Sequence, residues 1–410
     1  MNRDDPQVGE IDRTAGTLSG SPGLEGRLVR RLLRSLGDPP LRVTLWNGES
    51  ILSGAGEPAA GVRIENRRAL LGLLLNHELN FGDAYSDGSI QVEGDLVRLL
   101  EVLYRGMARA GAQRRTWFGG ARSNTLSRSR DNIHHHYDLG NDFYRMWLDQ
   151  EMVYTCAYFP DREATLEQAQ TAKMDHVARK LRLRPGETVV EAGCGWGALA
   201  LHFATRYGVR VRAFNISREQ LAYARERARA LNVQDRVEFV EDDYRNITGR
   251  YDAFVSVGML EHVGRDHYDE LGRVIDRSLG ANGRGLLHSI GRDRPGELNA
   301  WIEKRIFPGA YPPTLREMLS VLEPRDFSVL DVENLRLHYA LTLVHWLRRF
   351  ESACERVEAM YDQGFTRAWR LYLAGSIAAF NTGALQLFQV SFSRASSNDI
   401  AWTRAHLYQS

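Results

Sequence analysis

The pattern of apolar and polar positions is most regular from about residue 186 onward. Short apolar runs there alternate with longer amphipathic segments, which is how strands and helices differ in sequence. The expected strands are Val189–Ala192, Val209–Phe214, Val237–Glu241, Tyr251–Val257 and Gly285–Ile290, and the expected helices are Ala198–Arg206, Arg218–Leu231 and His267–Leu279. This alternation predicts an α/β fold with a doubly wound, Rossmann-like, mostly parallel sheet covered on both faces.

The pattern changes toward the C-terminal end. Phe327–Val332 has the composition of a strand, and Leu341–Met360 and Arg367–Phe380 have helical periodicity. Leu387–Ser393 alternates apolar and polar residues like an edge strand, and we expect it to be an antiparallel last strand. The longest charge-free run, Leu371–Ser393, has several amide side chains in its second half, so it is interpreted as a buried helix plus a strand and not as a membrane span.

The first part of the chain has a different character. After a polar stretch expected to form a loose tail, Leu24–Leu36 predicts an amphipathic helix in which arginines alternate with leucines. Its basic face is interpreted as solvated, and the alternative is a surface that lies on an anionic membrane. Further expected elements are strands and turns over Leu41–Ile64, helices over Arg67–Leu75 and Leu96–Met107, and a turn-rich stretch, FGDAYSDGSIQVEGD, between these helices.

A basic, polar stretch over residues 108–131 is interpreted as a linker. It predicts a domain boundary near residue 125. The two expected domains are a small, mainly helical N-terminal domain, 1–125, which would contact a membrane or a partner subunit, and a catalytic domain, 126–410.

Composition excludes a few classes of function. The formal net charge of +1 gives no overall attraction to nucleic acid, so no nucleic-acid partner is expected. Cys156, Cys194 and Cys354 are too few for a disulfide framework and do not have zinc-site spacing, which favours a reducing compartment. The N-terminus lacks the apolar core of a secretory signal, and a cytoplasmic location is therefore expected.

The sharpest local motif is Glu191-Ala-Gly193-Cys-Gly195-Trp-Gly197, where the first strand of the alternating region gives way to a helix. Glycines at such a turn let the backbone pass close to a ligand. A nicotinamide site would more often show G-x-G-x-x-G and an acid at the end of the second strand, but that strand ends here in Asn215-Ile-Ser. The alternative interpretation is a tight turn without a ligand.

This glycine motif resembles the first motif of class I methyltransferases, which bind S-adenosylmethionine. The resemblance implies a cofactor site to which this loop contributes Glu191, Gly193, Gly195 and Gly197. By the same resemblance, Asn215 and Gln220 would lie near the ribose, and Asp243 and Tyr244 would flank the adenine.

Five further segments, ordered along about residues 130–395, make the resemblance specific. They are His136–Tyr144 (HYDLGNDFY), Tyr154–Phe159 (YTCAYF), Gly258–Gly264 (GMLEHVG), Leu287–Gly291 (LHSIG) with Trp301–Ile302 and Ile306–Gly309 (IFPG) after it, and Gln386–Val390 (QLFQV) with Phe392–Arg394 after it. Together they resemble the cyclopropane-fatty-acyl-phospholipid synthase family. The turn GDAY at 82–85 is similar, less strongly, to the N-terminal domain of its bacterial members.

The resemblance implies an enzyme that adds a one-carbon unit from S-adenosylmethionine to the double bond of an unsaturated phospholipid acyl chain. Methyl transfer leaves a carbocation, and a base must remove a proton from the new methyl group before the ring closes. Such a site has to exclude water and present aromatic faces to the cation. The local candidates for these faces are Tyr154, Tyr158, Phe159 and Tyr339.

Members of the family are understood to hold bicarbonate as that base. Matching motifs assign its ligands here to Cys156, Glu261, His288 and Tyr339, with backbone near Ile290. The same matching places Tyr154 and Thr155 over the cofactor, helped by the His136–Asn141 segment, and makes a helical insert at about 336–384 the cover of the acyl site.

Each assigned residue has a simpler interpretation. Glu261 would favour the N-terminal end of the following helix, His288 and Tyr339 are also typical of cores, and Cys156 beside aromatic residues often only packs. Joint occurrence in matching motifs favours the catalytic interpretation. Ser376 stands where many members have a cysteine, which the carbocation route does not require. The histidine run at 134–136 is not interpreted as a metal site, because only His136 matches the family pattern.

Three other functions stay open. A hydride shift and a different proton loss would give a methylene- or methyl-branched chain, a lipid- or cofactor-binding protein would have no turnover, and a small-molecule methyltransferase would lack a long apolar site. The expected location is the inner face of the membrane, peripherally associated. A homodimer, and acyl chains carried by a protein instead of a phospholipid, are left undecided.

Overall fold

The computed structural model describes residues 23–111 and 139–408, and its larger part is built on a seven-stranded sheet. The strand order is β10-β11-β9-β8-β5-β6-β7. The strands are β5 (Thr188–Ala192), β6 (Arg210–Asn215), β7 (Val237–Glu241), β8 (Tyr251–Val257), β9 (Leu279–Gly291), β10 (Phe327–Asn334) and β11 (Gln386–Arg394). Strands β5 to β9 are parallel, whereas β11 and β10 are antiparallel to their neighbours. The predicted doubly wound sheet with an antiparallel last strand is confirmed.

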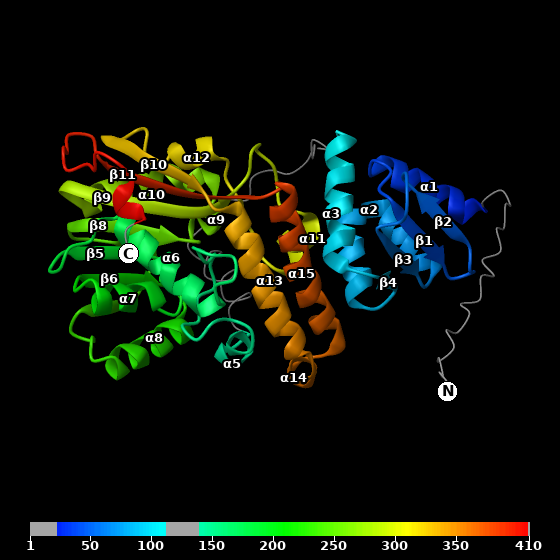
Figure 1. The fold of residues 1–410 in the computed structure, drawn as a ribbon, viewed down its shortest axis with the longest axis horizontal. Coiled ribbons are helices and arrows are strands. Elements are labelled where there is room, and N and C mark those ends of the chain that lie inside the picture. The colour runs from blue at the N-terminus through cyan, green and yellow to red at the C-terminus, as the bar shows by residue number, and fades with distance from the viewer. Residues whose placement is uncertain (1–22, 112–138, 409–410) are drawn as a thin grey trace, which may run out of the picture.

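Helices cover both faces of this sheet (Figure 1). They include α6 (Leu166–Lys180), α7 (Ala198–Arg206), α8 (Arg218–Ala230), α9 (Leu260–Val263), α10 (Tyr268–Ser278) and α12 (Leu315–Leu319). The pleat of β9 divides two cores: Leu286 packs with α6, α7 and α8, and the next residue, Leu287, packs with α10 and α12. The predicted strands and helices of this region are confirmed, and of the six helices named above, α6, α9 and α12 were not predicted.

The last strand, β11, lies inside the sheet, so the edge position predicted for it is wrong. It pairs with β9 on one side and β10 on the other, and nearly all of its residues are buried. The alternating polar residues do not face water; Gln389, for example, is fully buried against His288. Because a buried polar face with hydrogen-bond partners has the same period as a solvated one, the sequence pattern misled this prediction.

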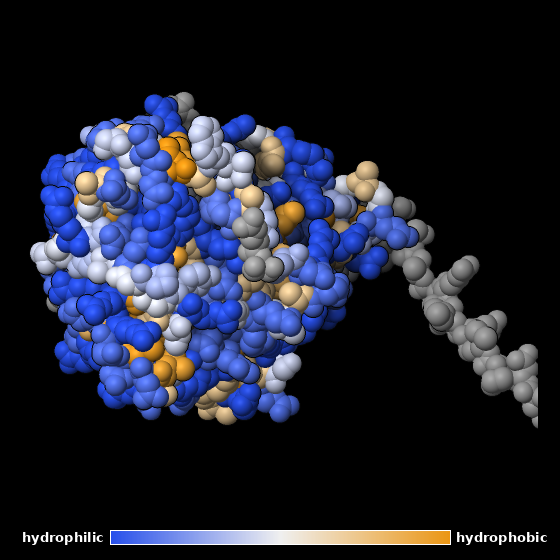
Figure 2. Space-filling view, turned by 60° about the vertical axis from the view of Figure 1, so that its left-hand side comes forward, coloured by the Kyte–Doolittle hydropathy of each residue, from blue (hydrophilic) through white to orange (hydrophobic). Residues whose placement is uncertain are grey.

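Three helices lie between β10 and β11 in the chain. They are α13 (Arg336–Ser352), α14 (Cys354–Met360) and α15 (Gln363–Thr382). The single helix predicted over Leu341–Met360 begins earlier and breaks at Ala353. The charge-free run is a buried helix end followed by a strand, as predicted. Within the described ranges, 23–111 and 139–408, no helix combines the length and apolarity needed to cross a bilayer. Figure 2 shows a mostly hydrophilic face with small, separate apolar spots.

The N-terminal part folds around a four-stranded sheet of order β2-β1-β3-β4. Its elements are α1 (Leu24–Ser35), β1 (Leu41–Leu45), β2 (Ser50–Ser53), β3 (Ala60–Ile64), α2 (Arg67–Ser86), β4 (Ile90–Glu93) and α3 (Leu96–Arg109). The stretch predicted to be turn-rich is instead mostly regular: α2 continues past a kink at Asn76 as far as Ser86, and a strand follows.

Gly82 explains this error. A glycine usually indicates a turn, but here it lies in a helix and allows the N-terminal part to pack closely against the rest of the molecule. A Cβ at Gly82 would lie 2.4 Å from the ring of Trp301, on α11 (Ala300–Arg305). Beside it, Asp83 and Arg305 form a two-bond ion pair of 2.9 and 3.0 Å. Helices α2 and α3 thus lie along α15 and α11 (Figure 1). The boundary predicted near residue 125 lies outside the described residues.

Candidate active site

The glycine loop follows β5 at the carboxyl edge of the sheet. Gly193, Gly195 and Gly197 all have positive φ, at 84°, 51° and 83°. A Cβ at Gly197 would lie 2.7 Å from Phe239 and 2.8 Å from Ala224, whereas a Cβ at Gly195 would meet nothing within 4 Å. The loop is therefore packed against the sheet on one side and open at Gly195, which fits the close approach of a ligand to backbone.

The end of β6 lies beside this opening. Asn215 donates from Nδ2 to the Gly195 carbonyl at 3.1 Å and to Oε1 of Gln220 at 2.8 Å. Gln220 is buried in the first turn of α8. The two residues expected near the ribose are thus brought together and tied to the glycine loop.

The residues expected near the adenine follow β7. Asp243 is buried, and its carboxylate accepts from the backbone N–H of Arg245 at 2.9 Å and from its guanidinium at 3.1 Å. Tyr244 packs into the core against α10, and burial, only partly offset by Arg245, raises the pKa of its hydroxyl group. Asp243 is held at the carboxyl edge with Asn215, because Asp242 donates its backbone N–H to the Asn215 carbonyl at 3.1 Å.

Glu191 is buried at the end of β5, behind the glycine loop. Burial raises the pKa of its carboxyl group to about 8, although Lys173 and a backbone hydrogen bond lower it. Among the described residues, Oε2 of Glu191 has no hydrogen-bond partner. Glu191 therefore belongs to a buried polar layer between the loop and α6.

The YTCAYF segment is an extended stretch clamped by two helices. From α6, Gln170 donates to the Thr155 carbonyl at 2.9 Å. From α13, Thr342 accepts from the backbone N–H of Ala157 at 3.0 Å, and His338 Nδ1 accepts from that of Phe159 at 3.0 Å. The Thr155 methyl group abuts Gly258, which follows β8 directly. The clamp places this segment over the carboxyl ends of the strands.

Tyr154 connects this segment to a wall of aromatic rings. Its hydroxyl group lies 2.8 Å from that of Tyr372. Tyr144 bridges it to the glycine loop, with ring centroids 5.4 Å from Tyr154 and 4.9 Å from Trp196. The remaining rings of this wall are Phe143, Trp147, Phe307, Tyr339, Trp346, Trp369 and Phe380. Most are fully buried, so the wall forms a water-poor environment.

Tyr158 does not offer the aromatic face expected of it. His176 and His338 stack on its ring, at 4.2 and 4.8 Å and within 17° of parallel. Because these rings cover it, a substrate cation would reach Tyr154 or Tyr339 more readily. Phe159 stacks instead on His345, at 5.5 Å.

Cys156 and Tyr339 lie in one core cluster, from the clamped segment and from α13. Burial raises the pKa of the Cys156 thiol, and the group donates to the Ala157 carbonyl at 3.1 Å. The thiol is therefore neutral and no nucleophile. Ile290 packs against the same cluster.

Glu261 is attached to Ile290 directly. Its Oε1 accepts from the Ile290 backbone N–H at 2.6 Å, so α9 and the end of β9 meet at this carboxyl group. Burial raises the pKa of Glu261 to about 7, although hydrogen bonds from backbone N–H groups, including that of Ile290, lower it. A carboxyl group poised near neutral pH is suited to proton transfer.

His288 lies two residues before Ile290 on β9 and is buried. Gln389 Nε2 donates to its Nδ1 at 2.9 Å, so a neutral ring carries its proton on Nε2. Burial and the positive charge of Lys173 lower the pKa of His288 to about 3. The imidazole is thus held as a neutral N–H donor.

Two site residues, Gln389 and Lys173, were missed from sequence, and a third, Asn141, was expected only as the end of the His136–Asn141 segment. Gln389 orients His288, Lys173 donates to the Thr155 hydroxyl group at 3.2 Å, and Asn141 accepts from Trp196 Nε1 of the glycine loop at 2.7 Å. Gln389 and Asn141 lie within the segments that resemble the family, and this position could have identified them as site residues. Lys173 lies on the unpredicted helix α6. Ser376, by contrast, only donates to the Tyr372 carbonyl one turn earlier, and residues 134–136 lie outside the described residues.

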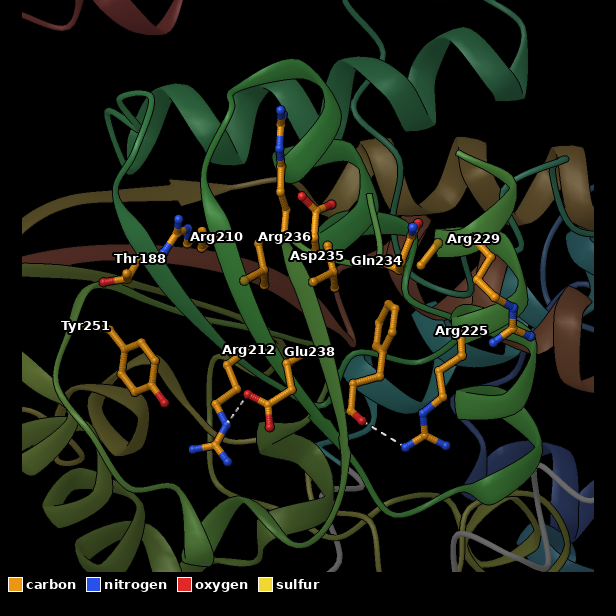
Figure 3. Close-up of a pocket in the computed structure, with 14 residues that line it drawn as sticks. Thr188, Arg210, Arg212, Arg225, Arg229, Gln234, Asp235, Arg236, Glu238 and Tyr251 are labelled. Atoms are coloured by element: carbon orange, nitrogen blue, oxygen red, sulfur yellow. Dashed lines mark hydrogen bonds and ion pairs between the residues drawn. The ribbon is translucent and has the colours of Figure 1, made fainter. Parts of the chain in front are cut away.

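The pocket in Figure 3, of about 610 Å³, contains none of the predicted site residues. It lies against the outer strands β6 and β7 and helix α8, and its arginines have local partners: Arg212 pairs with Glu238 at 3.0 Å and Arg225 donates to the Phe239 carbonyl at 2.8 Å. A second pocket, of about 700 Å³, borders Asn141 and the first turns of α8. No residue of the glycine loop lines that pocket, and its link to the loop is Asn141, which accepts from Trp196.

The family model described as mycolic acid cyclopropane synthetase matches residues 124–390. The chain belongs to this family. Residues 28–111 match a second model, described as a domain of unknown function (DUF7884). The family predicted from the five segments is therefore confirmed.

Similar proteins agree with this assignment. The chain is 36% identical to the cyclopropane-fatty-acyl-phospholipid synthase of Escherichia coli strain K12, over 85% of this chain and 92% of the relative. It is 35% identical to a probable fatty acid methyltransferase of Pseudomonas putida, over 90% and 96%. Among solved structures, the mycolic acid cyclopropane synthase CmaA1 complexed with SAH and CTAB has a TM-score of 0.61 at 29% identity, over 64% of this chain and 98% of that one.

These findings confirm that the chain is an enzyme, an S-adenosylmethionine-dependent methyltransferase of the cyclopropane synthase family. At the coarser level of function, it is a cyclopropane fatty acid synthase or a related lipid methyltransferase.

Proposed function

We propose that this enzyme transfers a methylene unit from S-adenosylmethionine to the cis double bond of an unsaturated phospholipid acyl chain, giving a cyclopropane ring. The observation that carries the proposal is the buried Glu261, hydrogen-bonded to the Ile290 N–H and with its pKa raised to about 7. In the proposed reaction this group would take part in removing the proton from the new methyl group. The near full-length similarity to the Escherichia coli enzyme supports the substrate class.

The described residues fit S-adenosylmethionine. The open side of Gly195, with Asn215, Gln220 and Asp243 at the next strand ends, would hold it, and Tyr154 and Thr155 would cover it. When bound, the cofactor supplies an electrophilic sulfonium methyl group. The protein would orient the alkene toward that group and keep water away with the buried aromatic wall.

The residues also fit a small oxyacid anion such as bicarbonate. His288 presents a fixed N–H, the Ile290 backbone and Tyr339 lie nearby, and Glu261 has a second buried oxygen without a hydrogen-bond partner among the described residues. Bicarbonate, when bound, supplies a base for the new methyl group. In this proposal Glu261 shares the proton that the anion takes up. Cys156 lies beside the anion as a neutral thiol, because burial raises its pKa.

The acyl chain would be bound by elements outside the sheet. The helices α13 and α15 carry Tyr339, Trp346, Trp369 and Phe380 toward the clamped segment, and would cover the chain. The N-terminal domain, which packs on α15, would meet the membrane surface from the inner side. A homodimer stays a prediction.

A branched product is the second candidate, because the Pseudomonas putida relative is described as a probable fatty acid methyltransferase, a name that does not specify a ring. Methyl transfer would be the same, and loss of a different proton would leave an alkene in the chain. A protein that only binds lipid or cofactor would not need a carboxyl group poised near neutral pH.

The test is mass spectrometry of acyl chains after incubation of the enzyme with S-adenosylmethionine and vesicles of mono-unsaturated phospholipid. Gain of CH₂ with loss of the alkene is expected, and gain of CH₂ with the alkene retained would indicate the branched product. Glu261→Gln should lower turnover by about 100-fold or more without unfolding, because the amide oxygen still accepts from Ile290. Glu355→Gln, an exposed acid on α14, is the matched control. An unchanged lipid with cofactor bound would contradict the proposal.

A further inference from the structure

Lys173 is a buried cation that the reaction scheme above does not use. Its side chain lies on α6 and the residue is only 2% exposed. The ammonium group donates to Thr155 Oγ1 at 3.2 Å, next in sequence to Cys156. An ammonium group has three N–H donors. Within residues 23–111 and 139–408, that hydroxyl group is the one acceptor within hydrogen-bond distance of Lys173 Nζ.

A second lysine on the same helix provides a comparison. Lys180 is also buried, but its ammonium group pairs with Glu333 at 2.7 Å and Asp331 at 3.6 Å. Lys173 has no carboxylate within ion-pair distance in the described part of the chain. Burying a charge without such compensation costs several kcal/mol, so Lys173 has the features of a residue that awaits an anion.

Two buried acids, Asp149 and Glu191, act on Lys173 without forming an ion pair or a hydrogen bond with it in the described residues. Burial raises the pKa of Asp149 to about 6, so its carboxylate stays mostly charged at neutral pH and offsets part of the charge of Lys173 from a distance. Both carboxylate oxygens of Asp149 accept backbone N–H groups, from Val153 at 2.9 Å and Glu151 at 3.0 Å. Glu191 is buried, and its raised pKa of about 8 leaves it mostly protonated at neutral pH. Burial also lowers the pKa of Lys173, to about 8, which leaves the ammonium group mostly charged.

Cys156 and His288, two groups of the proposed anion pocket that the charge of Lys173 affects, carry no charge to offset it. Cys156 is a neutral thiol, and His288 is a neutral imidazole whose pKa is lowered by burial and then by Lys173 itself. Apart from Glu261, whose pKa of about 7 leaves it partly ionised, the pocket therefore combines one buried positive charge with neutral hydrogen-bond donors, which favours a monovalent anion.

We propose that Lys173 is a positioning residue that supplies the positive charge of the bicarbonate pocket and, through Thr155, fixes the segment that carries Cys156. This inference rests on the proposed function and adds a residue to it. Lys173 would act on the anion through its field and on Thr155 through its hydrogen bond.

The test measures the initial rate against bicarbonate concentration in carbon dioxide-depleted buffer, with S-adenosylmethionine and mono-unsaturated vesicles saturating. Lys173→Gln keeps a donor for Thr155 without the charge, and Lys173→Arg keeps the charge. Lys173→Gln should raise the half-saturating bicarbonate concentration by at least about tenfold, while calorimetry shows the affinity for S-adenosylhomocysteine within about threefold of wild type. Lys173→Arg should restore part of the bicarbonate affinity.

Lys180→Met is the matched control on the same helix. It should lower the unfolding temperature but leave half-saturation by bicarbonate close to that of the wild type. If the wild type turns over without bicarbonate, the bicarbonate pocket is wrong. If the wild type requires bicarbonate and Lys173→Gln requires no more of it, the role of Lys173 alone is overturned. If the Gln variant does not fold, Lys173→Arg alone decides. This variant keeps the positive charge, so a rise of about tenfold or more in its half-saturating bicarbonate concentration would also overturn the role of Lys173.

Discussion

At the scale of single residues, burial holds Cys156 and His288 neutral and brings the pKa of Glu261 close to neutral pH. It raises the pKa of Cys156 and, to about 7, that of Glu261, and lowers that of His288 to about 3. A carbocation formed beside these groups would meet no strong nucleophile among them. In the proposed reaction Glu261, with its pKa near neutral pH, would share the proton that the bound anion takes up.

The glycine loop allows a prediction that separates stability from cofactor binding. Alanine at Gly195 or Gly197 costs about 1–2 kcal/mol of backbone strain, because both residues have a left-handed backbone. At Gly197 the new methyl group also collides with Phe239 and Ala224, which adds roughly 1–3 kcal/mol. At Gly195 the methyl group enters open space.

Gly197→Ala should therefore lower the free energy of unfolding more than Gly195→Ala does. Gly195→Ala should weaken S-adenosylhomocysteine binding more, by about tenfold or above. Denaturant unfolding and calorimetry check the two effects. Equal losses of affinity in both variants would mean that Gly195 does not face the cofactor.

At the scale of elements, α6 connects the glycine loop, the clamped segment and the far edge of the sheet. Its first half contacts the site through Gln170 and Lys173. Its second half attaches to β10, where Glu333 accepts from Lys180 at 2.7 Å and lies 2.8 Å from His176 Nε2. Polar contacts at both ends thus set the position of the helix.

The contact with β10 should be pH-dependent. Burial raises the pKa of Glu333, but His176 and Lys180 outweigh burial and lower the pKa from 4.5 to about 2. A lowered pKa means that the carboxylate stabilises the fold above the unfolded-state value and loses this effect as the pH falls. Glu333→Gln should cost roughly 2–3 kcal/mol at pH 7, and the difference from wild type should shrink as the pH falls from about 4.5 toward 2.

Urea unfolding at a series of pH values measures this difference. Glu238→Gln is the control, because its pair with Arg212 is largely exposed and such pairs contribute at most about 1 kcal/mol. A Glu333→Gln effect that does not change with pH would show that lost packing, not the ion pair, causes the destabilisation.

At the scale of the whole molecule, the N-terminal domain is fixed to the helices that cover the site. Arg367 of α15 donates to the Tyr85 and Ile90 carbonyls at 2.6 and 3.0 Å. Gly82 lets α2 approach Trp301 of α11. Because α15 also carries Tyr372, the partner of Tyr154, a disturbance at this interface can reach the clamped segment.

Gly82→Ala should therefore destabilise the fold by about 1–3 kcal/mol and lower turnover more than it lowers affinity for S-adenosylhomocysteine. Gly375→Ala, on α15, is the control: its Cβ meets nothing within 4 Å, and alanine favours a helix by about 0.8–1.0 kcal/mol over glycine. Denaturant unfolding, calorimetry and product analysis provide the readouts. Unchanged stability in Gly82→Ala would mean that the interface adapts easily.

The sequence by itself determined the alternation of strands and helices, the glycine loop and the identity of the family. These features depend on the local periodicity of apolar residues and on short motifs. Both can be recognised without knowing which distant residues pack against them. It also indicated Asn215 and Glu261, through the resemblance of its motifs to those of the family.

Only the tertiary structure decided where polar residues are buried. The sequence pattern of β11 is that of an edge strand, yet His288, about a hundred residues away, accepts the Gln389 amide inside the sheet. Gly82 lies in a helix and is a glycine because Trp301 packs against it. Lys173 points inward from α6, a helix that was not predicted because its sequence is largely polar. In each case the deciding partner is remote in sequence, and the period of a segment carries no information about it.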